Sequence, residues 1–252
     1  MAVIGAHALG GIAEVRAGDD LAALISAAAA AGDLDDDSVV AIAHTAVSKA
    51  EGAVVALADV QPGDRARALA AAEGKDPRLV QVVLDESEEL LRAERGVLIS
   101  RTRHGLVCAN AGVDVSNAGA TGVAVLLPRD PDGSARAIRA RLRELGAGAA
   151  PAVLITDTFG RAWRNGQTDV AIGAAGFAPL DDWRGRSDAD GAPLQATWLA
   201  VADAAAAAAD LARRKDSREP VVVLRGLGEF VTAEDGPGAT ALVRPLDEDL
   251  FR

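Results

Sequence analysis

Four side chains that can bind a metal or an anion follow an apolar run in the second half of the chain. The stretch LITDTFGRAWRNGQTD occupies residues 154–169, and its apolar start is typical of a buried strand. Asp157 and Thr158 close that run, and Arg161 and Arg164 follow. One interpretation is a polar turn whose arginines pair on the surface. The other is an anion site, in which a metal and an arginine clamp share one phosphate or carboxylate.

A second acidic segment offers the other half of a metal site. CANAGVDVSNAG contains Asp114 and Asn117 among small residues. Carboxylate, hydroxyl and amide oxygens are hard ligands of the kind that Mg²⁺ or Mn²⁺ takes, with waters and phosphates completing the shell. Taken singly, Asp114 and Asp157 are each typical turn formers. Only their pairing from separate segments favours a metal site.

Other polar groups leave both a functional and a structural interpretation open. Lys49 follows an apolar run in TAVSKAEG, where its ammonium could meet a phosphate or simply be solvated. His44 and His104 lie near predicted strand ends, and Cys108 is predicted to be a small buried hydrophobe. The sequence contains no P-loop, no strand–GxGxxG–helix unit, no HExxH and no cysteine pair. Any nucleotide is therefore bound by an uncommon route.

The elements that must position these groups alternate irregularly. Predicted helices are residues 19–31, the stretch that follows an Asp76 N-cap and Pro77, SARAIRARLRELG between Ser134 and Gly146, and the alanine-rich LQATWLAVADAAAAAADLARRK. Predicted strands are residues 39–47, two strands joined at the His104–Gly105 turn, GVAVLLP, PAVLITDT and EPVVVLRGL. We expect an α/β fold with mixed sheets flanked by helices, in a two-lobed single chain with a cleft. The polar loop DDWRGRSDADGAP is either a substrate loop or a solvated connection.

Composition narrows the class of protein. Half of the 252 residues are apolar but only 3% are aromatic, so the core must be built from Ala, Val and Leu. The net charge of −11 argues against non-specific nucleic-acid binding and leaves a small anionic ligand open. A single cysteine excludes an intrachain disulfide, the N-terminal stretch has the pattern of a poor signal peptide, and no uncharged apolar run reaches the length that a membrane span needs. We expect a cytoplasmic protein that binds no nucleic acid and no membrane.

Seven stretches together resemble one known family. They are GDDLAALI, TAVSKAEG, KDPRLVQVVLDES, RHGLVCANAGVDVSN, ITDTFGRAWRNGQTDVAIG, DWRGRSDADGAPLQAT and PVVVLRG, in this order over residues 18–226. In them the chain resembles the coenzyme F420:L-glutamate ligases, also called F420-0:gamma-glutamyl ligases. The resemblance implies one ligase domain over residues 1–252 and a homodimer. It also implies GTP-dependent addition of L-glutamate, in gamma linkage, to the deazaflavin precursor F420-0 through an acyl phosphate.

The resemblance also implies a set of site residues. Asp114 and Asp157 match the ligands of a first divalent ion, Mg²⁺ or Mn²⁺, and Thr158 matches a ligand of a second one; a monovalent cation such as K⁺ is compatible with this set. Matches to guanine-nucleotide contacts are Ile12, Ala13, Glu14, Val15, His44, Thr45, Lys49 and Asn117. Ala13 stands where the family usually has proline.

The stretch ARRKDSREP departs from the family pattern. A polar ligand of the second ion is expected around Arg214 or Lys215, in a segment that closes the nucleotide site, but neither side chain is a reasonable ligand at neutral pH. Arg218 likewise replaces a glycine. Either basic side chains replace part of a metal's charge, or nucleotide binding is weakened. Two alternative functions follow: a metal-dependent nucleotide phosphohydrolase, and a non-catalytic homologue that binds deazaflavin or nucleotide.

Overall fold

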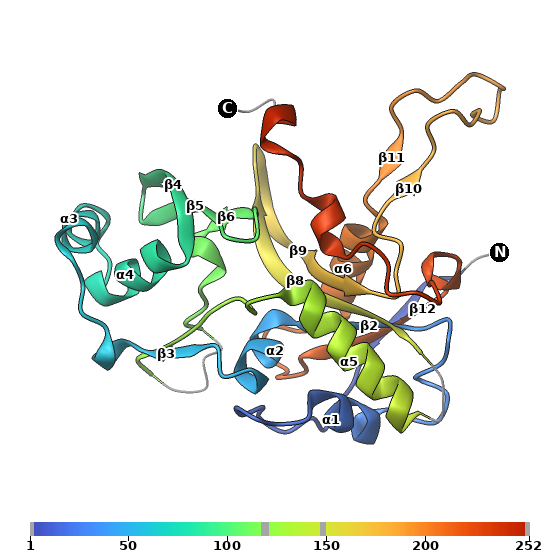
Figure 1. Ribbon diagram of the computed structural model, residues 1–252, viewed down its shortest axis with the longest axis horizontal. Helices are drawn as coiled ribbons and strands as arrows, with labels where there is room; N and C mark the ends of the chain where they lie inside the picture. Colours follow the sequence, from blue (N-terminus) through green and yellow to red (C-terminus); the bar gives the residue numbers. More distant parts are fainter. Residues whose placement is uncertain (1–2, 117–120, 147–149, 250–252) are drawn as a thin grey trace.

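A five-stranded mixed sheet forms the centre of the protein, in a computed structural model that describes residues 3–116, 121–146 and 150–249 (Figure 1). Its strands, in spatial order, are β1 (Gly5–Ala8), β12 (Val221–Arg225), β2 (Val39–Ala43), β8 (Ala152–Arg161) and β9 (Arg164–Ala175). β2 and β8 run parallel, and the other neighbours are antiparallel. The carboxyl end of β2 therefore lies beside Thr156 in the middle of β8, which continues to Arg161.

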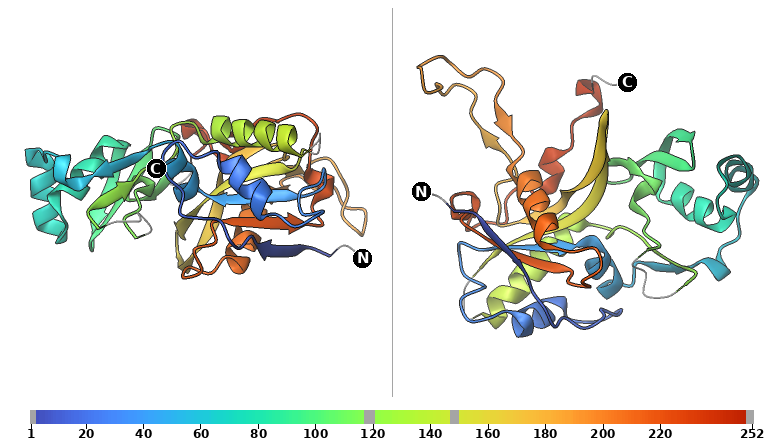
Figure 2. Two further views of the ribbon diagram at one scale, coloured as in Figure 1. Left: turned by 90° about the horizontal axis from the view of Figure 1, so that it is seen from below. Right: turned by 180° about the vertical axis from the view of Figure 1, so that it is seen from behind.

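Helices bury both faces of this sheet (Figure 2). Val40 and Ile42 of β2 face a core shared with α1 (Leu21–Ala28), α2 (His44–Ala50) and α5 (Pro131–Leu145), whereas Val39 and Ala41 face α6 (Val201–Ala212). This two-residue alternation with both faces buried explains why the strand is apolar throughout. The α6 face is a stripe of alanines with helical spacing, Ala202, Ala205, Ala206 and Ala209.

A second group of elements lies to one side of the main sheet (Figure 1). It comprises α3 (Asp64–Glu73), α4 (Pro77–Asp85) and a sheet of β4 (Ser87–Glu94), β5 (Val97–Thr102) and β6 (Val107–Ala109). Ala66, Ala70, Val80, Val83 and Leu98 give it a small core of its own. The antiparallel pair of β3 (Val54–Ala56) and β7 (Val123–Val125) connects it to the remainder of the chain.

An arm of residues 183–197 projects from the opposite side of the molecule, above β10 (Asp181–Asp182) and β11 (Trp198–Leu199) (Figure 1). Five short 3₁₀ turns complete the described elements: η1 (Leu57–Asp59), η2 (Asn110–Gly112), η3 (Gly228–Phe230), η4 (Ala239–Leu242) and η5 (Leu246–Glu248). Within the described parts of the chain, no helix is both long enough and apolar enough to cross a membrane.

Several expectations from the sequence are confirmed. The fold is mixed α/β with several sheets. Asp76 caps α4 through a hydrogen bond from the Arg78 amide, and Pro77 is the first residue of that helix. His104 and Gly105 lie in the turn between β5 and β6. The two-lobed outline with a cleft stays a prediction, as does a single domain over residues 1–252.

Other element boundaries were predicted wrongly. The strand predicted over residues 39–47 ends at Ala43, and the apolar run continues as α2, because period alone does not separate a buried strand from a short buried helix. The helix predicted over residues 19–31 is Leu21–Ala28, capped by Asp20. α5 starts at Pro131, not after Ser134, because the Asp130 side chain caps it. The alanine-rich helix starts only at Val201, since Trp198 and Leu199 form β11.

Candidate functional site

One large cavity opens at the carboxyl end of β2 and beside the middle of β8, and ligands bind at strand carboxyl ends in many open α/β sheets. Its volume is about 960 Å³. It is lined by residues 12–15, the start of α2, residues 114–116 and 121–123, the middle of β8, and residues 213–215 and 218–220. We call it the central cavity. Its walls thus come from segments spread along most of the chain.

Asp157 points into the central cavity from the middle of β8. The Thr158 amide donates to its carboxylate at 2.7 Å, and His44 Nε2 lies 3.4 Å from the same oxygen. Burial raises the pKa of Asp157, and the negative charges of Asp169 and Asp114 raise it further, while His44 opposes the shift. The ionised form of this buried carboxylate is therefore disfavoured, and a bound cation would stabilise it.

Asp114 forms the facing wall. Its backbone pairs with Val125 through two hydrogen bonds, and its carboxylate accepts from the Ser116 amide and hydroxyl, each at 2.7 Å. Asp114 is therefore a turn former and a cavity residue at the same time. The two interpretations of this residue do not exclude each other.

The pair of carboxylates fits a divalent ion that keeps most of its shell open. Among the described residues, no cluster of three or more His, Cys, Asp or Glu side chains could hold a metal alone. Mg²⁺ is commonly bound through one or two carboxylates, with waters and substrate phosphates supplying the rest. Asp114 and Asp157, which both line the cavity, meet that requirement.

A second polar group lies beside this pair, between β8, β9 and the end of α6. Asp169 is 1% exposed; it accepts from the hydroxyls of Thr156 at 2.8 Å and Thr158 at 2.7 Å, and from Arg213 at 3.1 Å. Sequence reasoning assigned no role to Asp169 or Arg213. Asp169 is the cross-strand partner of Thr158, and that register cannot be read from either strand alone.

Basic side chains gather on one edge of the central cavity. The lining residues include five acidic side chains, Glu14, Asp114, Asp157, Asp169 and Glu219, and five basic ones, Lys49, Arg213, Arg214, Lys215 and Arg218. Four of the basic ones belong to residues 213–218, which we call the basic segment. A chain with a net charge of −11 thus has a formally balanced cavity wall, with positive charge concentrated on one side. This arrangement suits an anionic ligand.

Most of the predicted site residues converge on this cavity. Those that line it are Ile12, Ala13, Glu14, Val15, His44, Thr45, Lys49, Asp114, Asp157, Thr158, Arg214 and Lys215. Lys49 is not simply solvated, because its ammonium lies 2.6 Å from Glu14 Oε1. Asn117 lies outside the described residues.

Arg161 and Arg164 do not reach the central cavity, so the expected arginine clamp is not formed within the chain. β8 does not end at Thr158 but continues to Arg161, and β9 begins at Arg164. Three further residues of strand carry Arg161 about 10 Å beyond Thr158. There the Arg161 guanidinium donates to the Asn165 carbonyl at 2.6 Å. The local pairing at the tip of the hairpin is the alternative that the sequence left open.

The surroundings of His104 and Cys108 indicate structural roles for these two residues. His104 Nε2 lies 3.1 Å from the Arg129 carbonyl, in the turn between β5 and β6. Cys108 is buried as predicted, and burial, with the nearby charge of Asp157, raises the pKa of its thiol to about 12. A thiol with so high a pKa is protonated at neutral pH and is not a nucleophile.

A mixed α/β chain with one large, charged cavity beside its two parallel strands has the features of a small-molecule-binding enzyme. The family model described as F420-0:Gamma-glutamyl ligase matches residues 11–226. The chain belongs to this family.

Curated relatives are similar over nearly their full lengths. Proteins named coenzyme F420:L-glutamate ligase from Methanopyrus kandleri and Methanothermobacter thermautotrophicus are 47% and 45% identical to this chain. The alignments cover 95% of this chain and 94% of the first relative, and 96% of both chains for the second. A protein of the same name from Haloarcula marismortui is 43% identical over 97% of this chain and 94% of its own.

Proposed function

We propose that the chain is a GTP-dependent ligase that joins L-glutamate in gamma linkage to coenzyme F420-0, or its dehydro form, and that it works as a homodimer. One observation carries the proposal: a single cavity collects a carboxylate pair, a basic edge and the residues that match nucleotide contacts. Family membership and relatives named coenzyme F420:L-glutamate ligase support the substrate class.

The chemistry requires an activated carboxylate, because an oxide ion does not leave a free carboxylate. The terminal carboxylate of F420-0 attacks the γ-phosphorus of GTP, which releases GDP and forms an acyl phosphate. The α-amine of glutamate then attacks the acyl carbon, loses a proton, and expels inorganic phosphate. Such transfers need positioning and charge neutralisation more than a protein nucleophile.

The chain's own groups can supply that positioning. Asp114 and Asp157 would hold a divalent ion, Mg²⁺ or Mn²⁺, which when bound neutralises phosphate charge. Lys49, fixed by Glu14, presents a point charge from α2. The basic segment also lines the cavity, where its positive groups can contact an anionic nucleotide.

Replacing Asp157 by asparagine tests this proposal. We expect Asp157→Asn to reduce glutamylation by more than about 100-fold, because losing even an outer-shell partner of a metal costs about 10–100-fold. Mass spectrometry of F420-0 after incubation with GTP, glutamate and Mn²⁺ measures the added glutamyl residue. Asp64→Asn is the matched control, because Asp64 is fully exposed on α3 and does not line the cavity.

The same assay separates the alternative functions. A nucleotide phosphohydrolase would release phosphate from GTP without acceptor and would leave F420-0 unchanged. A non-catalytic homologue would bind GTP or the deazaflavin without turnover. Near wild-type glutamylation by a folded Asp157→Asn protein would show that the metal assignment is wrong. Light scattering on a sizing column tests the homodimer, for which the mass must be twice the 25.6 kDa of one chain.

A further inference from the structure

The polar group around Asp169 already contains its own cations. Asp169 and Asp210 supply two negative charges, and Arg213 and Lys215 supply two positive ones. Arg213 Nη1 lies 3.1 Å from Asp169 Oδ2, and Lys215 Nζ lies 2.9 Å from Asp210 Oδ1 and 3.8 Å from Asp169 Oδ1. The formal charge of the group is zero, unlike that of the carboxylate pair at Asp114 and Asp157.

Lys215 also bonds the hydroxyl that would serve a second metal ion. Its ammonium donates to Thr158 Oγ1 at 2.9 Å, and that hydroxyl in turn donates to Asp169 at 2.7 Å. A divalent ion bound to Thr158 Oγ1 would share that oxygen with the ammonium, and the two positive charges would lie close enough to repel each other. A protonated lysine has no lone pair to offer as a ligand. The residues present therefore do not fit a second divalent ion.

The turn after α6 places Lys215 at the edge of the central cavity. α6 ends at Ala212, and the Ser217 hydroxyl and amide both donate to the Arg214 carbonyl, at 3.0 and 3.2 Å. Lysine is also rare in this chain: the sequence contains three, Lys49, Lys75 and Lys215, and two of them line the central cavity. An ammonium is a compact point charge on a flexible stem, so Lys215 can follow a phosphate without leaving the cavity edge.

We infer that Lys215 is a built-in cation that takes the place of a second divalent ion beside Thr158, so that the central cavity holds one such ion per chain. The inference depends on the proposed function only in taking Asp114 and Asp157 as the site of the first divalent ion. It goes beyond that function because it assigns this chain a different metal stoichiometry and gives the basic segment a specific role. The Lys215 ammonium supplies positive charge in place of a second ion, whatever the concentration of the metal.

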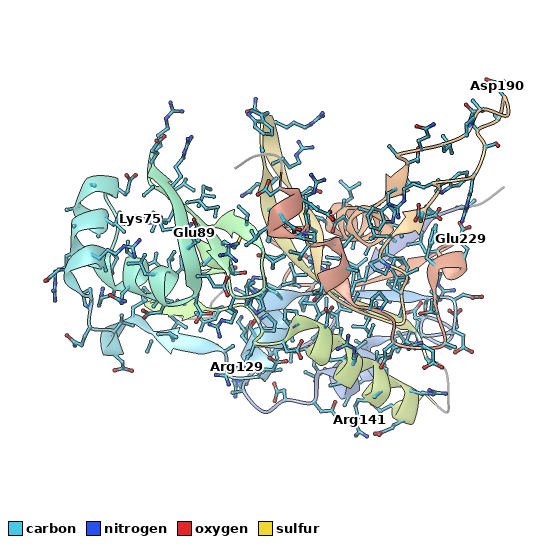
Figure 3. The ribbon with its side chains drawn as sticks, turned by 45° about the horizontal axis from the view of Figure 1, so that its top comes forward. Lys75, Glu89, Arg129, Arg141, Asp190 and Glu229 are labelled. Atoms are coloured by element: carbon cyan, nitrogen blue, oxygen red, sulfur yellow. The ribbon has the colours of Figure 1, made fainter. Side chains whose placement is uncertain are left out.

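Counting bound ions tests the inference without any catalysis. Equilibrium dialysis against Mn²⁺ and a non-hydrolysable GTP analogue measures the excess manganese and nucleotide per chain. We expect one Mn²⁺ for the wild type, two for Lys215→Gln, which removes the charge and leaves an amide oxygen, and one for Lys215→Arg, which keeps the charge. Lys75→Gln is the matched control and must match the wild type, since Lys75 lies at the far end of the molecule (Figure 3).

The outcomes separate this inference from the proposed function. Two ions on the wild type, or no additional ion on Lys215→Gln, would overturn the inference while leaving the ligase proposal intact. No ion on the wild type but one on Lys215→Gln would support exclusion by Lys215 and would count against the carboxylate pair. Circular dichroism and the thermal midpoint of each variant show that the counted protein is folded.

Discussion

At the scale of single residues, the central cavity depends on a carboxylate that is almost fully buried in its wall. Asp169 binds two hydroxyls and Arg213, which itself donates to the Ala41 carbonyl in β2. The pair of Asp169 and Arg213 thereby ties β8, β9 and the end of α6 to the strand that leads into α2. Asp169 thus holds neighbouring residues of the cavity wall in place.

Replacing Asp169 by alanine should therefore destabilise the whole protein. The change leaves the Arg213 guanidinium, whose side chain is 9% exposed, without its carboxylate, and breaking a buried ion pair from one side costs about 3–5 kcal/mol. Urea denaturation followed by circular dichroism gives the free energy of unfolding. Asp64→Ala breaks the exposed pair with Arg67 and should cost no more than about 0.5 kcal/mol. Equal losses for the two variants would contradict this account of Asp169.

The residue scale also shows what the sequence can and cannot predict about the site. Asp114, Asp157, Lys49 and their matched neighbours were predicted from contiguous motifs, and contiguous motifs remain contiguous in any fold. Asp169 was not predicted, because its partnership with Thr158 depends on the register of a hairpin. The sequence left the arginine clamp and surface pairing both open for the same kind of reason, since the end of β8 is set by pairing with β9 and not by local composition.

At the scale of elements, the first turn of α6 is attached to β9 by a single carboxylate. Asp203 accepts a hydrogen bond from the Ala171 amide at 3.0 Å. Burial raises the pKa of Asp203 above its ordinary value of 3.8, and the Ala171 hydrogen bond only partly opposes the shift. The helix is thus held by a group that folding makes harder to ionise.

The pH dependence of stability follows from the sign of that shift. Because the folded pKa exceeds the unfolded one, the contribution of Asp203 to stability is fully present below pH 3.8 and is lost as the pH rises through the folded pKa. Asp203→Asn keeps an oxygen for the Ala171 amide and has no charge to bury. We expect this variant to be more stable than the wild type at neutral pH and to lose that part of the pH dependence.

Urea midpoints measured from about pH 4 to 7 check this expectation. Asp216→Asn is the control, because the Asp216 side chain is 78% exposed in the turn after α6. Parallel curves for wild type and Asp203→Asn would show that the carboxylate is not desolvated in solution. Asp203→Ala should instead lose about 1–3 kcal/mol, since it leaves the Ala171 amide without this acceptor.

At the scale of the whole molecule, the sequence predicts the interior strands of the central sheet but not all of its strands. The apolar runs of β2, β8 and β12 and the alanine-rich α6 were predicted from composition and pattern, whereas β1 and β9 were not predicted. The group of α3, α4 and β4–β6 and the projecting arm have no such signal for where they lie. Their positions depend on contacts between segments far apart in sequence.

The arm lies apart from the central cavity. Its residues 183–197 do not line the cavity, and Asp190 lies at its outer end, away from the main sheet (Figure 3). Its base is fixed locally: Asp182 pairs with Trp198 across β10 and β11, and the Arg184 guanidinium lies 4.4 Å from the Trp198 ring centre and 2.6 Å from Asp182. This pairing brings the two ends of the arm together without help from its tip.

Replacing residues 186–194 by two glycines should therefore leave the chain folded. The arm shares no core cluster with the sheet, and a shorter loop costs less entropy to close, so we expect the thermal midpoint to shift by no more than about 2–4 °C, which corresponds to about 1 kcal/mol. Mn²⁺ and GTP-analogue binding should also match the wild type. If both hold while glutamylation is lost, the arm is a substrate loop; if glutamylation is kept, it is a solvated connection. A loss of cooperative unfolding would instead show that the arm belongs to the folded core.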